Sequence, residues 1–267
     1  MWSVPSGPSA ASLHARQGSD SDKSDVRPLK AWRPHGAGST ATHMMVAMGW
    51  NLKLNCKAVL FDMDGTLVDS GVVVERAWGL WAARHGIPLE TVLSFSHGRP
   101  TIATMEHFFP DRDHTRELEE MDAYEETNLD GILAVPGAAQ AVHALQNHSW
   151  AIVTSAWRGL AEARVLAAGL PLPKVMVPVD EIRRGKPDPE GFLQAAGRLG
   201  VAPEDCLVFE DTRPGIEAGV SAGMQVVALL TTSPAEHLNH RPLVRDFRDV
   251  RIQPDGEYIK LEIKAVT

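Results

Sequence analysis

The sequence KAVLFDMDGTLVDS, at residues 57–70, holds the first signals of fold and chemistry. Its apolar run, Ala58 to Phe61, predicts a short buried strand. Two acids, Asp62 and Asp64, follow the strand directly, and a Gly-Thr pair ends it. A carboxylate at the end of a strand can act as a nucleophile, and neighbouring carboxylate oxygens are hard ligands for a divalent cation. Asp-Gly is also a common turn pair, so this motif alone is equally compatible with a strand that enters a hairpin turn.

The composition is that of a globular protein with a negative net charge. Of the 267 residues 44% are hydrophobic, enough for one sizeable core and a smaller appended domain. The net charge of -8 argues against a nucleic-acid partner and against a polybasic membrane anchor. No apolar run approaches the ~20 residues of a membrane span. The two cysteines, Cys56 and Cys206, lie next to strand-like runs, which favours buried free thiols in a cytoplasmic protein over a disulfide.

Residues 1–54 differ in composition from the rest of the chain. They are rich in Ser, Gly and Pro and have no sustained period, which predicts a disordered N-terminal extension. No apolar segment suited to a signal peptide follows the start, and the acids of residues 20–25 argue against a transit peptide. A biological tail, upstream sequence translated from a misplaced start and an added leader are all compatible with residues 1–47. We expect their deletion to leave activity intact.

A helical region follows the opening motif. After Ser70, apolar residues recur at steps of three and four up to Gly86, which predicts a helix. Further short helices, with no strand between them, are predicted over 89–95, 100–108 and 114–128. We expect residues 70–130 to form a small all-helical domain, with Trp78 and Trp81 in its core.

From Pro136 onward, predicted helices alternate with short apolar strands. Strands are expected over 150–154, 174–177, 206–209 and 225–230, and helices over 137–147, 158–168, 189–199 and 214–222. This alternation is typical of an α/β fold with a doubly wound parallel sheet covered on both faces. We assign residues 55–69 and 131–267 to this core domain. Residues 250–263 carry a Pro-Asp-Gly turn between two alternating runs and predict an antiparallel hairpin at the edge of the sheet.

Polar side chains follow the predicted strands at their carboxyl ends. Besides the two acids of the opening motif, these are Thr154, Ser155, Glu210 and Asp211. In a parallel sheet such ends meet at one rim, where ligands bind. Lys186 adds a cation from the loop RRGKPDP, whose prolines hold it outside regular structure. The set suits phosphoryl transfer, with Mg²⁺ bridging carboxylates and phosphate while the lysine and the hydroxyls hold the other phosphate oxygens.

Plainer interpretations of the same residues stay open at this point. A loop lysine such as Lys186 is more often simply solvated. Thr154 and Ser155 are suitable caps for the helix that follows them, and Glu210 and Asp211 are suitable caps for the helix near Pro214. These structural roles are compatible with the functional ones.

Four segments, in this order, resemble the motifs of the haloacid dehalogenase (HAD) superfamily: FDMDGTLVDS, IVTSA, RRGKPDP and VFEDTRPGIEAG. The resemblance covers Cys56 to about Leu230 and implies a HAD-like, doubly wound parallel sheet with a small all-helical type-one cap inserted after the first strand. The segments VERAWGLWAARHGI, HGRPTI, WAIVTSA and IQPDGEYI make the chain most similar to bacterial sugar phosphatases. That group includes 2-deoxyglucose-6-phosphatases, glycerol-3-phosphatases and β-phosphoglucomutase-like enzymes.

The resemblance implies a role for each residue of the rim. Asp62 is expected to be the nucleophile that becomes an aspartyl-phosphate, and Asp64 the general acid for the leaving alcohol and then the base for water. Mg²⁺ is expected to bind the carboxylates of Asp62 and Asp211 and the backbone carbonyl of Asp64. Glu210 would support the ion through its waters, although either acid of the Glu210-Asp211 pair suits direct ligation. Thr66 is expected to hold the region of Asp64.

The cap is expected to choose the substrate. His97 and Arg99 match the family's specificity loop, where Arg99 would reach polar groups of the leaving alcohol, although a loop His or Arg is as often merely exposed. The resemblance thus implies a cytoplasmic, monomeric, Mg²⁺-dependent phosphatase of small sugar or polyol phosphates. The alternatives are a phosphosugar mutase, which passes the phosphoryl group to another hydroxyl of the sugar, and a non-enzymatic binding module. No expected acid, hydroxyl or lysine is missing, which argues against the latter.

Overall fold

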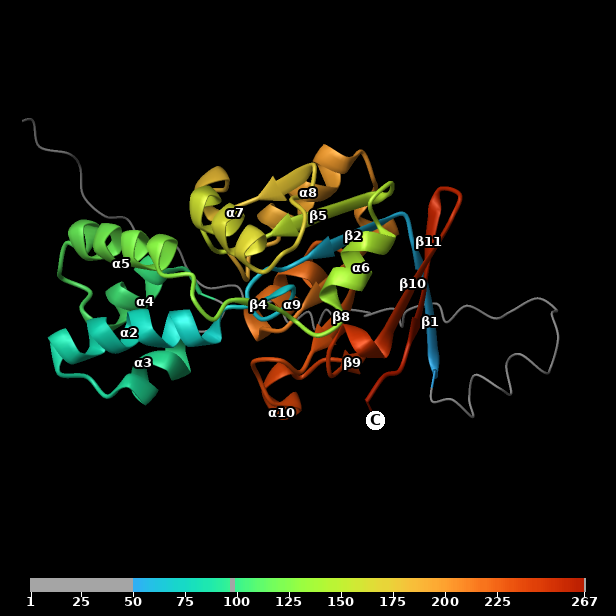
Figure 1. The fold of residues 1–267 in the computed structure, drawn as a ribbon. Helices are drawn as coiled ribbons and strands as arrows, with labels where there is room; N and C mark the ends of the chain where they lie inside the picture. Colours follow the sequence, from blue (N-terminus) through green and yellow to red (C-terminus); the bar gives the residue numbers. More distant parts are fainter. Residues whose placement is uncertain (1–49, 97–98, 267) are drawn as a thin grey trace, which may run out of the picture. The chain divides into compact units, whose positions relative to one another are not determined.

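A six-stranded parallel sheet lies at the centre of the structure, a computed structural model that describes residues 50–96 and 99–266. The strand order is β6-β5-β2-β7-β8-β9, and every neighbouring pair is parallel. Figure 1 labels β2, β5, β8 and β9 of this sheet. The strands are β2 (Ala58–Phe61), β5 (Ser149–Val153), β6 (Val175–Val177), β7 (Cys206–Glu210), β8 (Gln225–Leu229) and β9 (Leu243–Val244). All residues of β2 are buried, which explains its continuous apolar sequence, because a central parallel strand is covered on both faces.

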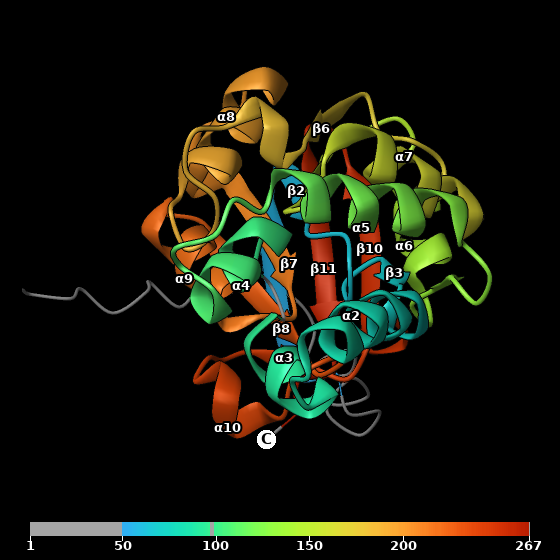
Figure 2. The ribbon, with the colours of Figure 1, turned by 90° about the vertical axis from the view of Figure 1, so that its left-hand side faces the viewer.

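Helices cover both faces of this sheet (Figure 2). They are α6 (Ala138–Ala144), α7 (Arg158–Ala167), α8 (Glu190–Leu199), α9 (Arg213–Ser221) and α10 (Ala235–Leu238), with single 3₁₀ turns at Val179–Glu181, Pro203–Asp205 and Phe247–Asp249. Side chains of α6 and α7 pack on one face and those of α8, α9 and α10 on the other. Successive side chains of β2 point to opposite faces, so Val59 and Phe61 belong to the first cluster and Ala58 and Leu60 to the second. The predicted doubly wound parallel sheet is confirmed.

A second, antiparallel sheet corrects two predictions. The hairpin of β10 (Val250–Asp255) and β11 (Tyr258–Ile263) forms as expected, but it pairs with β1 (Leu52–Cys56) and does not extend the edge of the parallel sheet. Alternate residues of β11 are buried against the α6 face of the core, because a strand with one apolar face can cover a core as a helix does. The boundary expected after residue 54 falls inside β1, whose burial alternates in the same way.

The helical insert lies between β3 (Val68–Asp69) and β4 (Leu133–Ala134), which pair antiparallel at its base. Its helices are α2 (Gly71–His85), α3 (Leu89–Ser96), α4 (Thr101–Phe108) and α5 (Thr115–Thr127). They share a core of their own, in which the rings of Trp78 and Trp81 meet edge to face with centroids 5.5 Å apart. The predicted helices and their tryptophan core are confirmed, while the division into domains at residues 69 and 130 stays a prediction.

Two further expectations concern the cysteines and membrane spans. Cys56 and Cys206 are free and buried, as expected. Across residues 50–96 and 99–266, no helix has the length and apolar character needed to cross a membrane.

Candidate active site

Three carboxylates meet where β2 and β7 end. Asp62 follows β2, and its N–H continues the ladder by donating to the carbonyl oxygen of Phe209 at 3.0 Å. Glu210 ends β7 and Asp211 follows it; both are fully buried, and Asp62 is only 6% exposed. One carboxylate oxygen from each of the three acids lies within 4.8 Å of the others. The strand ends therefore meet at one rim, as a parallel sheet requires.

Lys186 lies among these carboxylates. Its Nζ donates to Asp62 Oδ1 and, at 2.6 Å, to Glu210 Oε1, and the side chain is 6% exposed. Burial alone would lower the pKa of Lys186, but the charges of Asp62 and Glu210 outweigh it and raise that pKa. The interpretation of Lys186 as a solvated loop lysine is therefore wrong.

One lysine does not neutralise three buried acids. Burial raises the pKa of Asp62 well above its usual range; Lys186 opposes this, and the charges of Glu210 and Asp211 add to it. Burial, followed by the charge of Glu210, raises the pKa of Asp211 to about 7. Buried carboxylates with too few cations are costly, and their oxygens are the ligands that Mg²⁺ prefers. The rim can therefore hold a hard divalent cation.

Asp211 is fixed by two hydroxyl groups and by a close approach of the opening motif. Thr66 Oγ1 donates to Asp211 Oδ1 at 2.8 Å, and Thr232 Oγ1 donates to Asp211 Oδ2. Gly65 has φ +83°, and a Cβ atom there would lie 2.2 Å from Asp211 Oδ2. The Asp-Gly pair thus brings the loop against Asp211, and Thr66 contacts that acid rather than Asp64. Sequence reasoning missed Thr232, although it follows β8, the next strand of the rim.

Glu210 accepts hydrogen bonds from Thr212, the residue that precedes α9. Thr212 donates to Glu210 Oε2 from its N–H at 2.7 Å and from its hydroxyl at 2.9 Å. The same hydroxyl accepts a hydrogen bond from the N–H of Gly215 and caps α9, so neither Glu210 nor Asp211 is the cap. A Cβ atom on Gly215 would lie 1.6 Å from Glu210 Oε1, so only glycine leaves room for this carboxylate.

Thr154 and Ser155 lie beside the lysine, at the end of β5. With Lys186 they line one small cavity of about 10 Å³. Thr154 is buried, and its hydroxyl oxygen accepts a hydrogen bond from the N–H of Ala156 at 3.1 Å. The residue at the cap position of α7 is Trp157, so neither hydroxyl caps that helix.

Asp64 faces a different set of partners. Ser70 Oγ donates to its Oδ1 at 2.5 Å, and Arg164 Nη1 donates to its Oδ2 at 2.9 Å. Arg164 belongs to α7 and forms a second ion pair, 3.3 Å long, with Glu125 Oε1 of helix α5 in the insert. Burial raises the pKa of Glu125 to about 7, and the charge of Arg164 opposes that rise.

Sequence reasoning missed Arg164 and Glu125. A signal for the arginine existed, since it lies at helical spacing among the apolar residues that bury one face of α7: Leu160, Ala161 and Val165. A charged residue on an apolar face needs a partner. The identity of that partner was not readable, because Glu125 belongs to a helix of the insert.

Arg99 lies at the edge of the insert that faces the lysine loop. Its guanidinium lies over the ring of Phe95, 4.4 Å from the centroid. The next residue approaches the core, since a Cβ atom on Gly185 would lie 3.6 Å from Pro100 Cγ. The segment of Arg99 therefore lies next to the loop of Lys186. His97 lies outside the described residues.

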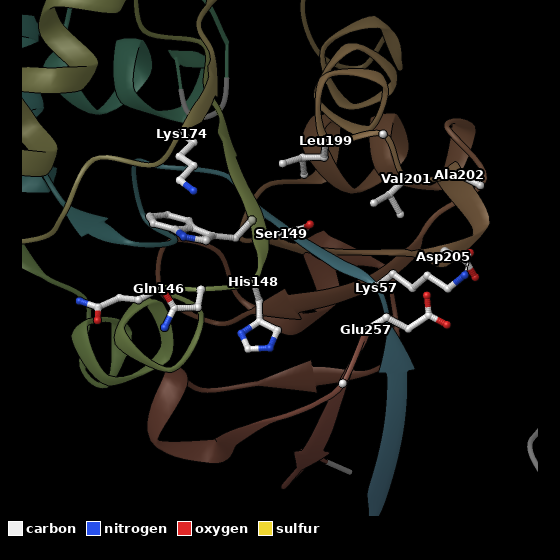
Figure 3. Close-up of a pocket in the computed structure, with 14 residues that line it drawn as sticks. Lys57, Gln146, His148, Ser149, Lys174, Leu199, Val201, Ala202, Asp205 and Glu257 are labelled. Carbon is white, nitrogen blue, oxygen red and sulfur yellow. Dashed lines mark ion pairs between the residues drawn. The ribbon is translucent and has the colours of Figure 1, made fainter.

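A much larger cavity, of about 690 Å³, lies at the other end of the strands (Figure 3). It is lined by residues at the amino ends of β2, β5 and β7, among them Lys57, Ser149 and Asp205. Lys57 and Asp205 form an ion pair of 3.2 Å, and their side chains are 31% and 40% exposed. In the described part of the chain, the cluster of acids able to hold a metal lies at the carboxyl ends and not here.

The chain is similar in sequence and in fold to known hydrolases. A family model described as haloacid dehalogenase-like hydrolase matches residues 56–223. Hexitol phosphatase A of Escherichia coli (strain K12) is 41% identical over 214 residues, which cover 77% of this chain and 99% of that protein. Validoxylamine A 7'-phosphate phosphatase of Streptomyces hygroscopicus subsp. limoneus is 37% identical over 204 residues, which cover 73% of this chain and 96% of that protein. A solved hydrolase from Pseudomonas syringae has a TM-score of 0.65 and 27% identity, covering 73% of this chain and 95% of that one.

Proposed function

The chain belongs to the haloacid dehalogenase-like hydrolase family, and we propose that it is a Mg²⁺-dependent phosphatase of small sugar or polyol phosphates. The predicted family, fold and enzyme class, a phosphoric monoester hydrolase, are confirmed, and the alternative of a non-enzymatic binding module is set aside. One observation carries the proposal: Lys186 is ion-paired with both Asp62 and Glu210 beside Asp211 at a buried rim.

Asp62 is the proposed nucleophile. A carboxylate oxygen of Asp62 attacks phosphorus, the bond from phosphorus to the alcohol oxygen breaks, and an aspartyl-phosphate forms. Water then attacks phosphorus and regenerates the carboxylate. Lys186 orients Asp62 through their ion pair, and with the hydroxyls of Thr154 and Ser155 it supplies donors for the phosphate oxygens.

Asp64 is the proposed proton carrier. It gives its proton to the oxygen of the leaving alcohol and later takes a proton from the attacking water. Asp64 suits this task better than Asp62, because its carboxyl group is 29% exposed and is not part of the three-acid cluster.

The three-acid cluster fits Mg²⁺. With all three acids ionised, Lys186 leaves two negative charges uncompensated, as many as the charges of the ion. When bound, Mg²⁺ would neutralise charge on the phosphate oxygens. We assign the carboxylates of Asp62 and Asp211 and the backbone carbonyl of Asp64 as ligands. Both acids accept hydrogen bonds on both oxygens, but Glu210 is ion-paired with Lys186, whereas Asp211 accepts from the neutral hydroxyls of Thr66 and Thr232. This difference favours Asp211 as the direct ligand and an outer role for Glu210.

The substrate class rests on the relatives and on the insert. A hexitol phosphatase is 41% identical to this chain over nearly the whole length of that phosphatase. Arg99 adds an exposed guanidinium near the lysine loop, where it can donate to hydroxyls of the leaving alcohol. Substrate contacts of His97, a cytoplasmic location and a monomeric state stay predictions.

The test is a panel of phosphorylated metabolites assayed with Mg²⁺ and with chelator. We expect release of inorganic phosphate from hexitol phosphates, 2-deoxyglucose 6-phosphate or glycerol phosphates, lost in EDTA and restored by Mg²⁺, with kcat/KM ranking the substrates. Isomerised sugar phosphate without released phosphate would favour the mutase instead. Turnover by Asp62→Asn near the wild-type rate would contradict the mechanism.

A further inference from the structure

A buried arginine, Arg164, forms ion pairs with both the insert and the core. We propose that Arg164 is a positioning residue for Asp64, held in place by Glu125 of helix α5, so that the insert helps to set the proton carrier of the core. This inference rests on the proposed phosphatase function.

The geometry makes Asp64 the main polar partner of Arg164. Arg164 is 4% exposed, and its Nη1 donates to Asp64 Oδ2 at 2.9 Å. Its Nε and Nη2 donate no hydrogen bond within residues 50–96 and 99–266, and Nη2 has only the ion-pair contact of 3.3 Å with Glu125 Oε1. Removing an arginine from water is costly, and the ion pairs with Asp64 and Glu125 offset part of that cost.

Glu125 ties this arrangement to the insert. It lies in α5, is 4% exposed and reaches Arg164 on α7 of the core. A guanidinium between two carboxylates has one preferred place, whereas a guanidinium with one partner can turn away from it. Glu125 therefore keeps Arg164 aimed at Asp64 for as long as α5 stays against α7.

The chemical consequence concerns the leaving group. When Asp64 gives its proton to the alcohol oxygen, the Oδ–H bond breaks, an alcohol O–H bond forms and a carboxylate remains on Asp64. Arg164 stabilises this carboxylate through the bond to Oδ2. Such help matters for an alcohol that leaves poorly, as from a sugar phosphate, and hardly matters for p-nitrophenolate, which leaves without a proton.

The experiment compares these two kinds of substrate in one enzyme preparation. For Arg164→Gln we expect kcat/KM with the best sugar or polyol phosphate of the panel to fall about 100-fold, and with p-nitrophenyl phosphate less than about threefold. The ratio of the two values does not depend on the fraction of folded enzyme. Arg164→Lys keeps the charge and should recover part of the ratio. Glu125→Gln keeps the arginine but removes the charge that holds it, so it should shift the ratio in the same direction by a smaller factor.

Two controls separate positioning from a structural role. Arg84→Gln removes an exposed ion pair between α2 and α5, 2.8 Å from Arg84 Nη1 to Glu120 Oε2, and should leave kcat/KM for both substrates unchanged. In an Asp64→Asn background, Arg164→Gln should have no further effect on the ratio, because the two residues act as a unit. Equal losses on both substrates, or the full loss in the Asp64→Asn background, would overturn the inference. A wild-type enzyme that releases no phosphate from any substrate would instead overturn the proposed function.

Discussion

The two ends of the parallel sheet differ in cavity volume and in how deeply their charged side chains are buried. The amino ends carry the larger cavity, about 690 Å³, with an ion pair whose partners are about one-third exposed. The carboxyl ends carry little empty space beside Lys186 but three buried acids around one lysine. Free volume alone therefore does not indicate the site. Buried charge that the protein leaves uncompensated does, because only a substrate, an ion or a proton can neutralise it.

The topology explains why the difference falls this way. Strand β2 is followed in the sheet by β5 on one side and β7 on the other, so the chain runs outward in both directions from the β2–β7 pair. At the carboxyl ends, this reversal lets the segments after β2 and β7 face each other. At the amino ends the incoming loops are exposed, and their charges are paired in solvent.

The largest effect is expected at Asp62, the proposed nucleophile. Asp62→Asn should reduce kcat by at least about 10⁴-fold, because an amide cannot replace the carboxylate that is proposed to form the aspartyl-phosphate. The fold should persist, because an amide is as large as a carboxyl group and the substitution removes one of three negative charges that repel one another. Steady-state kinetics and a thermal melt of the same sample check both points. Residual turnover within tenfold of wild type would assign the nucleophile elsewhere.

Lys186→Gln should come next. We expect a loss of about 10³-fold in kcat/KM, because a donor to the phosphate oxygens and the partner of Asp62 disappear together. Breaking a buried ion pair also leaves charge unpaired, so the free energy of unfolding should fall by about 3–5 kcal/mol. Urea unfolding measures that change. The loss of stability should be smaller at pH 5 than at pH 8, because the acids left behind can then take up protons.

These two predictions concern residues that the sequence identified, and the reason is local. Asp62 and Asp211 belong to short segments whose strand and turn signals place them at strand ends, and the prolines around Lys186 place it in a loop, in each case without knowledge of the packing. Arg164, Glu125 and Thr232 were missed, because their meaning depends on which helix or strand lies opposite. The position of the hairpin was wrong for the same reason: alternation predicts one buried face and does not say which core that face covers.

Mg²⁺ should stabilise the protein by binding to the acids at the carboxyl ends of the strands, and this gain should depend on pH. In the ion-free protein the pKa of Asp211 is raised from 3.8 to about 7, so its ionisation weakens the folded state as the pH rises from about 4 through 7. Mg²⁺ requires the ionised form and should therefore raise Tm more at pH 8 than at pH 6. At 100 times Kd the gain in stability should be about 2.7 kcal/mol. Asp211→Asn should abolish the gain, and an equal gain at both pH values would contradict this account.

The smallest effect is expected for Lys57→Gln, the matched substitution at the amino ends. Lys57 resembles Lys186 in pairing with a carboxylate that lies next to β7, Asp205, at 3.2 Å. Its partner is exposed, however, so water replaces the lysine when it is removed, and kcat/KM for the best substrate should stay within about twofold of wild type. The same chemical change thus tests both ends of one sheet. A loss above tenfold for Lys57→Gln, with Tm unchanged, would mean that the large cavity binds substrate. The burial of charged side chains would then be the wrong criterion for locating the site.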